Sequence, residues 1–146
     1  MAIDSSLAVR KGILTLLKGN ATLTAMVPAE RIYSQETEAA PKWPFIRLGV
    51  PSMVPIRAAC VDGASLILAV HAFAQTRIGG GVELETAEDY AHRIGATIAS
   101  ALDGQRLTLT NGMAAIRWTG SQLLQDPEEA SAFHAVVNFS VRALTA

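Results

Sequence analysis

The segment 132–144 alternates between apolar and polar side chains over most of its length. Its odd positions carry Phe133, Val137, Phe139 and Val141, and its even positions include His134, Asn138, Ser140 and Arg142. A period of two is typical of a β-strand, and polarity confined to one parity predicts a strand with one buried face and one exposed face. We therefore expect a sheet with one face that carries the polar positions of this strand.

Two dipeptides predict β-hairpins. Asp62-Gly63 stands between two apolar runs, and Asn111-Gly112 joins the segment 106–110 to the segment 113–125. Both dipeptides readily adopt the positive φ angles that tight hairpin turns need. The second arm of the first hairpin, residues 65–75, is apolar on both parities, which predicts a central strand covered on both faces.

A further strand is predicted at 45–50, directly after the stretch Pro41-Lys42-Trp43-Pro44. Each proline fixes its own φ and disfavours helical geometry in the residue before it, so we expect Trp43 to be extended. Because proline has no amide hydrogen to donate to a ladder, we expect this stretch at a margin of the sheet.

Helical periodicity occurs in two segments. In the first, residues 4–18, the apolar positions Leu7, Leu14 and Leu17 follow the cap candidates Asp4, Ser5 and Ser6. The second begins at residue 82, after a glycine-rich loop at 76–81, and can end at Gly104. Its apolar stripe consists of Leu84, Ala87, Ala91, Ile94, Ile98 and Leu102.

These elements predict an α+β fold, with a mainly antiparallel sheet and two main helices packed on one face. A chain of 146 residues that is 50% hydrophobic can bury one core, so we expect residues 1–146 to form a single domain. The net charge of -1 gives no global attraction to nucleic acid or anionic lipid. No apolar run approaches the roughly 18 residues of a membrane span, and the N-terminus lacks the pattern of a secretory signal, so we expect a soluble protein without membrane contact.

The sequence predicts no catalytic residue, cofactor or metal. The triple glycine 79–81 lacks the lysine of a phosphate-binding loop, and acidic residues fill the helix start that follows it. His71, His92 and His134 are dispersed, with no pair at the spacing of zinc ligands. Cys60, the single cysteine, has no local signature of a nucleophile and is expected to be a buried or half-buried structural residue.

Several segments, in this order, carry a resemblance that covers almost the whole chain. They are "DSSLAVRKGILTLLK", "WPFIRLG", "CVDG", "LAVHAFA", "ALDG" and "IRWTGSQLLQDPEEASAFHAVVNFSVRAL". Together they resemble the tail-completion or tail-terminator proteins of tailed bacteriophages and of phage-like gene transfer agents. The resemblance implies a non-enzymatic structural virion protein, assembled in the bacterial host cytoplasm and located at the head-proximal end of the tail.

Proteins of this kind form a ring, typically a hexamer, that stops polymerisation of the tail tube and takes part in head-tail joining. The implied partners are further copies of the chain, the tail tube protein and a head-completion or connector protein. DNA would pass through the lumen without tight binding, given the near-neutral net charge.

The chain's edge strands and the polar face of its last strand are expected to join neighbouring subunits. The segments 34–44, 51–58 and 76–82 are expected to reach along the tail axis, and the last of them to order on docking. Candidate interface residues are Trp43, Arg57, Arg77, Gly80, Trp118 and Arg142. A lumen-facing role is a further possibility for Arg57 and Arg77.

Other readings of the sequence remain open. A head-completion or stopper protein would share the joining role but belong to the head side. A small α+β module could bind a ligand beside the triple glycine, and an enzyme could use Cys60 with a histidine. A domain of an unrelated assembly would have the same composition.

Overall fold

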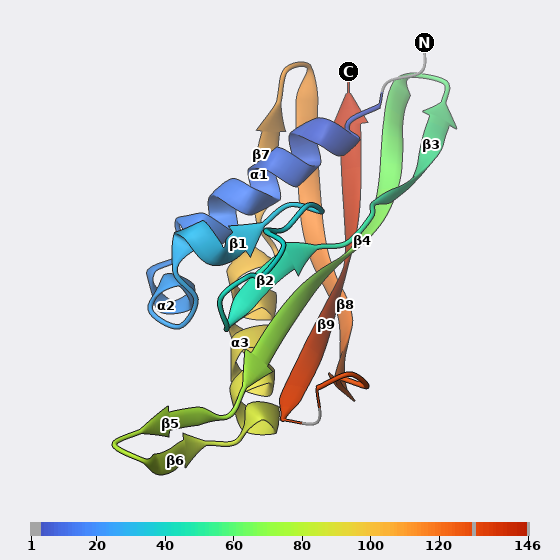
Figure 1. The fold of residues 1–146 in the computed structure, drawn as a ribbon. Helices are drawn as coiled ribbons and strands as arrows, with labels where there is room; N and C mark the ends of the chain where they lie inside the picture. Colours follow the sequence, from blue (N-terminus) through green and yellow to red (C-terminus); the bar gives the residue numbers. More distant parts are fainter. Residues whose placement is uncertain (1–3, 130, 146) are drawn as a thin grey trace.

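The computed structural model describes residues 4–129 and 131–145. Its main feature is a curled, mostly antiparallel sheet, with helices α1 (Ser6–Lys18) and α3 (Ala87–Leu102) packed against one face (Figure 1). We call the opposite face of the sheet the open face. The predicted α+β fold, with two main helices on one face, is confirmed.

The described part of the sheet has seven strands, in the order β1-β2-β4-β9-β8-β7, with β3 pairing with β4 beside β2. These are β1 (Ile32–Tyr33), β2 (Phe45–Leu48), β3 (Ser52–Ala58), β4 (Val61–Gln75), β7 (Arg106–Leu109), β8 (Gly112–Gln125) and β9 (Ala132–Thr145). Among these described strands, β1 and β2 pair in parallel and every other pairing is antiparallel. Two short helical segments, α2 (Ala21–Thr24) and a 3₁₀ turn (Ala29–Arg31), link α1 to β1.

Strand β9 has the predicted two-sided character. It pairs with β4 along one side and with β8 along the other. Its odd positions Val137, Phe139 and Val141 are fully buried against the helices, and its even positions lie on the open face. The alternation of apolar and polar residues in β9 thus corresponds to one buried and one open face of the sheet.

Strand β4 is central, as predicted, but the prediction that both of its faces are covered was wrong. Its even positions, such as Leu66 and Val70, are buried under the helices. Its odd positions lie on the open face, where the Ile67 side chain is 62% exposed. The second apolar parity therefore does not indicate a second covering layer within this chain.

The first predicted hairpin exists, formed by β3 and β4, but its turn lies at Ala59-Cys60 rather than at Asp62-Gly63. Gly63 lies inside β4 and is required there for a different reason. A Cβ atom at this position would collide with the backbone carbonyl oxygen of Ala143 on β9. Cys60 is exposed in the turn, so the expectation of a packed structural cysteine was wrong.

The second predicted hairpin, β7–β8, is also present, with its turn at Thr110-Asn111, one residue earlier than predicted. Strand β2 ends at Leu48 and lies between β1 and β4, so the short strand β1 separates it from the margin of the sheet. The peptide bond between Trp43 and Pro44, just before β2, is cis.

Helix α1 matches its predicted range, but it buries Val9, Ile13 and Leu17 and leaves Leu7 exposed. Helix α3 begins later than predicted, at Ala87, because the Thr86 hydroxyl accepts a hydrogen bond from the Asp89 backbone N–H and caps the helix. Among the described residues, no helix combines the length and apolar character that crossing a bilayer requires.

The segment predicted as a glycine-rich loop and first helical turn is instead a second, two-stranded sheet. Strands β5 (Arg77–Gly79) and β6 (Val82–Glu85) form a hairpin that projects away from the main sheet at the lower left of Figure 1. Gly80 and Gly81 make its turn with φ angles of 59° and 76°, which only glycine adopts without strain. We call this hairpin the arm.

Candidate interaction surfaces

The open face carries a cluster of aromatic and histidine rings where β2, β4 and β9 run side by side. Phe45 stacks on Phe73 with ring centroids 4.6 Å apart, and Phe73 stacks on His134 at 4.2 Å. The indole of Trp43 meets Phe45 edge-on at 5.1 Å. His71 Nδ1 and His134 Nε2 are 2.7 Å apart, so one ring nitrogen must donate a hydrogen bond to the other.

The electrostatics of this cluster favour neutral imidazoles. Partial burial, reinforced by the charges of His71 and Arg47, lowers the pKa of His134 to about 4, while Asp126 acts in the opposite direction. Burial and then the Arg47 charge also lower the pKa of His71. Arg47 itself lies over the Phe73 ring, with its guanidinium carbon 5.6 Å from the centroid.

The prediction that the three histidines are dispersed was therefore wrong for His71 and His134. The β4–β9 register pairs His71 with Val136 and Phe73 with His134, which makes the two histidines diagonal neighbours. No group of three or more potential metal ligands exists in the described part of the chain. The pair itself offers two nitrogens, fewer than a structural zinc site uses.

The arm presents apolar side chains to its surroundings. Ile78, Val82 and Leu84 are 67%, 62% and 55% exposed. Leu84, predicted to lie on the buried stripe of a helix, is thus on an exposed strand. Two predicted interface residues, Arg77 and Gly80, also belong to the arm.

The base of the arm is held to α3 by an ion pair. Arg93 donates two hydrogen bonds to the Glu85 carboxylate, at 2.9 and 2.8 Å, and Arg77 Nε lies 3.4 Å from the same carboxylate. Hydrogen bonding from Arg93 holds the pKa of Glu85 below its ordinary value. The guanidinium of Arg93 also lies over the Tyr90 ring, at 5.4 Å. These contacts fix the direction in which the arm leaves the body.

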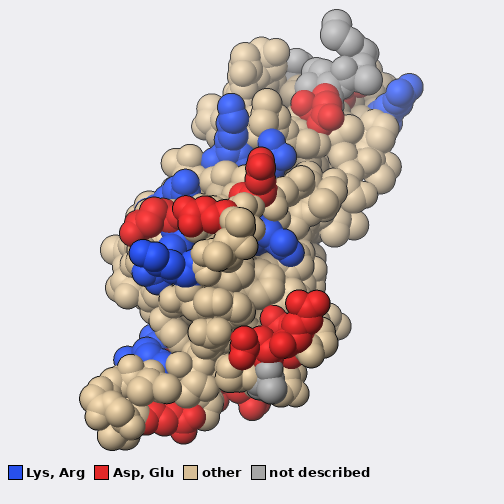
Figure 2. Space-filling model, in the orientation of Figure 1, with Lys and Arg blue, Asp and Glu red and all other residues tan. Residues whose placement is uncertain are grey.

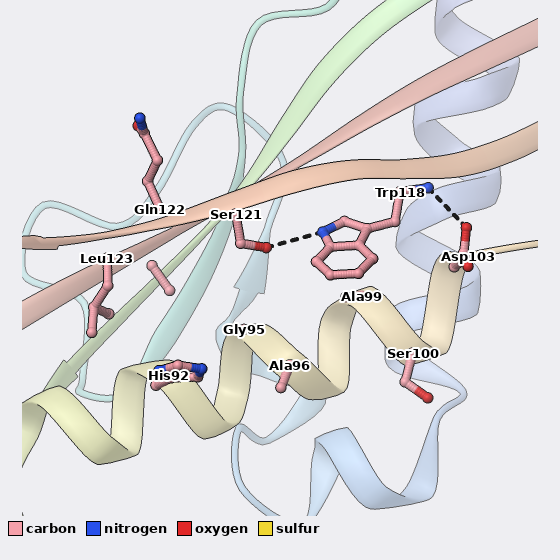
Figure 3. Close-up of a pocket in the computed structure, with 11 residues that line it drawn as sticks. His92, Gly95, Ala96, Ala99, Ser100, Asp103, Trp118, Ser121, Gln122 and Leu123 are labelled. Carbon is pink, nitrogen blue, oxygen red and sulfur yellow. Dashed lines mark hydrogen bonds between the residues drawn. The ribbon is translucent and has the colours of Figure 1, made fainter.

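A groove with a volume of about 480 Å³ lies between α3 and β8 (Figure 3). Small residues on the helix side, including Gly95, Ala96 and Ala99, leave room beside the strand. Trp118 lies over one end, where its indole N–H donates to Ser121 Oγ at 3.0 Å and its backbone N–H donates to Asp103 Oδ1 at 2.9 Å. The Trp118 side chain is 45% exposed, so the groove has an accessible aromatic wall.

The sequence-predicted candidates therefore occupy separate surfaces rather than one site. Trp43 belongs to the aromatic cluster, Arg77 and Gly80 to the arm, and Trp118 to the groove. Arg57 is exposed on β3 and lies opposite Asp62, and Arg142 is exposed on the open face. The triple glycine does not line the groove between α3 and β8.

Sequence reasoning missed the residues that share the open face with Arg142. Arg47, Arg106 and Arg117 come from three other strands, and nothing in their local sequence marks them as neighbours. The sequence indicates only which positions of each strand, odd or even, face away from the core. This information becomes useful only when the registers between strands are known.

Comparisons with known proteins give a consistent result. A chain in the structure of the virion of a native gene transfer agent particle superposes with a TM-score of 0.76 at 17% identity, covering 96% of this chain and 98% of that one. A second solved structure gives a TM-score of 0.58 at 14% identity, covering 97% and 96%. At these identities the likeness establishes a shared fold.

A comparison with curated protein sequences gave no significant match. The model of one protein family, described as tail completion protein gp17, matches residues 11–144. The matched residues begin within α1 and end one residue before the end of β9, so they include α3 and residues of every strand of the sheet. The chain therefore belongs to the tail completion protein gp17 family.

Proposed function

We propose that this protein forms a ring at the head-proximal end of a phage or gene transfer agent tail, ends growth of the tail tube and provides a surface for head joining. The observation that carries the proposal is the family match over residues 11–144. The fold likeness to a chain of a gene transfer agent virion supports it. Six subunits is the expected number, from the resemblance described above.

The two edges of the sheet suit a closed ring. On one edge, β7 pairs with β8 only over residues 112–115, and no described strand pairs with the outer side of β8 over residues 119–124. On the other edge, β3 pairs with β4 on one side only. Because these edges differ, a contact between them is heterologous, and repetition of a heterologous contact closes a ring when the rotation permits. Arg57 lies at one edge and Trp118 at the other, so both remain candidates for this contact.

The arm suits contact with a partner beyond the ring neighbours. It stands clear of the sheet in Figure 1 and exposes three apolar side chains, whose burial on assembly would stabilise the contact. The clamp formed by Glu85 and Arg93 means that little ordering is required on docking. We assign the arm to the contact with the tail tube protein or the head-completion protein.

The test is electron microscopy of particles from cells that lack this gene, with tail length and head attachment scored together. We expect overlong or variable tails that are detached from full heads, and restoration by the wild-type gene supplied in trans. Tails of regular length still joined to heads would overturn the terminator function. Tails of regular length without heads would instead favour a head-completion or stopper protein.

The groove beside Trp118 favours one alternative, a small module that binds an apolar ligand. Native mass spectrometry of the purified protein separates the two functions. A ring without added mass supports the proposal, and a monomer carrying a small molecule supports the alternative. Substitution of Ala96 by Leu, which would fill the groove, should leave a terminator ring active and abolish ligand binding.

A further inference from the structure

The open face of the sheet gathers basic side chains from four strands. The β7–β8 and β8–β9 registers place Arg106, Ala115 and Arg142 in one row across the sheet, on the parity opposite to the buried residues Ala114 and Val141. The next row includes Arg117 beside Ser140. Arg117 and Arg142 are therefore diagonal neighbours on adjacent strands.

Arg47 extends the basic face toward the aromatic cluster. It pairs with His71 on β4, whereas Arg142 pairs with Ser65 on the same strand. Six residues of β4 separate these two positions, which corresponds to about 20 Å at the rise of an extended strand. The basic groups thus follow the length of the face and do not converge on a single point.

No carboxylate from the described strands of the main sheet points to this face. Asp62 is the one acidic residue within those strands, and its register partner Thr145 is buried on the helix side. The chain has 12 basic and 13 acidic side chains, so its near-neutral net charge conceals a face with four arginines. Acidic and basic side chains are interspersed on the side of the molecule viewed in Figure 2.

The residues between the arginines indicate the kind of partner. Small or polar residues of the face include Ser65, Ala69, Asn138 and Ser140. Exposed apolar side chains lie on the same face, and they come from four strands: Val54, Ile67, Met113, Leu124 and Leu144. A protein interface generally has an apolar, tightly packed core, whereas surfaces that bind DNA are more polar and more positive. Charge complementarity therefore favours a nucleic acid over a second copy of this chain.

We propose that the open face lines the passage through the ring and that Arg47, Arg106, Arg117 and Arg142 contact the phosphates of duplex DNA as it passes. This inference rests on the proposed ring function. The contacts are independent of base sequence, because strand residues with small neighbours offer charge without a shaped reading surface. As the duplex moves, each arginine can release one phosphate and contact the next. Such contacts allow the DNA to slide, which agrees with passage without tight binding.

The first experiment measures binding of a short fluorescent DNA duplex by anisotropy, at several salt concentrations. It compares the wild type with the triple variant Arg106→Gln, Arg117→Gln, Arg142→Gln. The control triple, Arg10→Gln, Lys11→Gln, Lys18→Gln on α1, changes the net charge equally. Circular dichroism confirms that each variant folds.

We expect the open-face triple to lower affinity at low salt at least about tenfold and to reduce the slope of log affinity against log salt by about 3, and the control triple to retain the wild-type slope. Equal losses in both triples would mean that overall charge, not the open face, attracts DNA. Absence of wild-type binding at low salt would overturn the proposal.

The second experiment separates this inference from the proposed function. Cells lacking the gene are complemented with the open-face triple, and particles are scored for tail length, head joining and DNA delivery. Normal tails joined to heads, with impaired delivery, support the DNA contact. Overlong tails would assign the arginines to a contact between subunits and overturn the inference. Normal tails in the cells without complementation would overturn the proposed function instead.

Discussion

His71 and His134 form a short polar contact on the open face, with ring nitrogens 2.7 Å apart. At that separation the two rings share one hydrogen bond, and protonation of both would place like charges against each other and against Arg47. The phenyl ring of Phe73 stacks on His134 and removes water from one of its faces. The fold thus favours the neutral form of the pair.

Stability should depend on the charge of this pair. The folded pKa of His134, about 4, lies below its ordinary value of 6.5, so the unfolded chain binds the extra proton first as the pH falls. The stabilisation is therefore complete above pH 6.5 and is lost progressively toward pH 4, at no more than about 1.4 kcal/mol per pH unit for one proton. We expect His134→Gln to flatten this dependence in urea unfolding curves measured across the range.

The control for that experiment is His92→Gln, because His92 lies on the exposed side of α3. The pH dependence that the His71–His134 pair contributes should persist in this variant. Parallel stability curves for wild type and His134→Gln would show that the pair does not resist protonation in the folded protein.

For a single side chain, the sequence predicts which face of the sheet it occupies but not which distant residues it contacts. The alternation from Phe133 to Arg142 correctly places His134 on the exposed side of its strand. Its contact with His71, 63 residues away, depends on the register between β4 and β9, and no local pattern encodes that register. The same limit concealed the row formed by Arg106 and Arg142.

Among the elements, the arm shows how two local signals compete. Acidic residues and apolar spacing after residue 82 resemble the first turns of a helix, which led to the wrong helix start. Thr86 decides the outcome, since its hydroxyl caps the Asp89 N–H and starts α3 at the next residue. The Gly80-Gly81 turn then folds the preceding residues into a hairpin. A Gly-Gly dipeptide is itself a hairpin signal and was the available evidence for the arm.

The strands of the arm should open more often when the ion pair between Glu85 and Arg93 is removed. Glu85→Gln weakens the bonds from both Arg93 and Arg77, and a two-bond, partly buried pair of this kind contributes about 1 kcal/mol, equivalent to about a fivefold change in local opening. We expect faster amide exchange in residues 77–85 by hydrogen-deuterium exchange mass spectrometry. Exchange in α3 and β9 should stay the same.

Glu83→Gln is the matched control, since Glu83 is exposed on the same strand and changes the charge equally. Amide exchange in residues 77–85 should rise in Glu85→Gln and stay at the wild-type level in Glu83→Gln. If both variants behave alike, the direction of the arm depends on its strand pairing and not on the ion pair.

The molecule as a whole is organised around one core, to which α1, α3 and the strands of the main sheet contribute. Composition and periodicity predicted the α+β fold class and both main helices. They could do so because each helix and strand buries one face in the core, and that burial sets the spacing of its apolar residues. The order of the strands in the sheet could not be predicted, because it depends on contacts between distant segments. The bounds of β3 were also not predicted, because Asp62-Gly63 indicated a turn where the structure has part of β4. The single domain over residues 1–146 stays a prediction.

That prediction can be checked by unfolding. Trp43 lies beside β2 and Trp118 on β8, on opposite sides of the central pair β4–β9. If one core stabilises both regions, the variants Trp43→Phe and Trp118→Phe should give coincident urea transitions by fluorescence, matching the loss of circular dichroism. Separate transitions would reveal two independently stable units.

The position of β9 has a consequence for biosynthesis. This strand is translated after every other described element, yet it occupies the middle of the sheet, between β4 and β8. The nascent chain can form its helices and the local hairpins β3–β4, β5–β6 and β7–β8 on the ribosome, but β4 and β8 have no shared partner until β9 emerges. A message truncated within β9 therefore yields a chain with an incomplete sheet, which quality-control proteases can remove before it enters a particle.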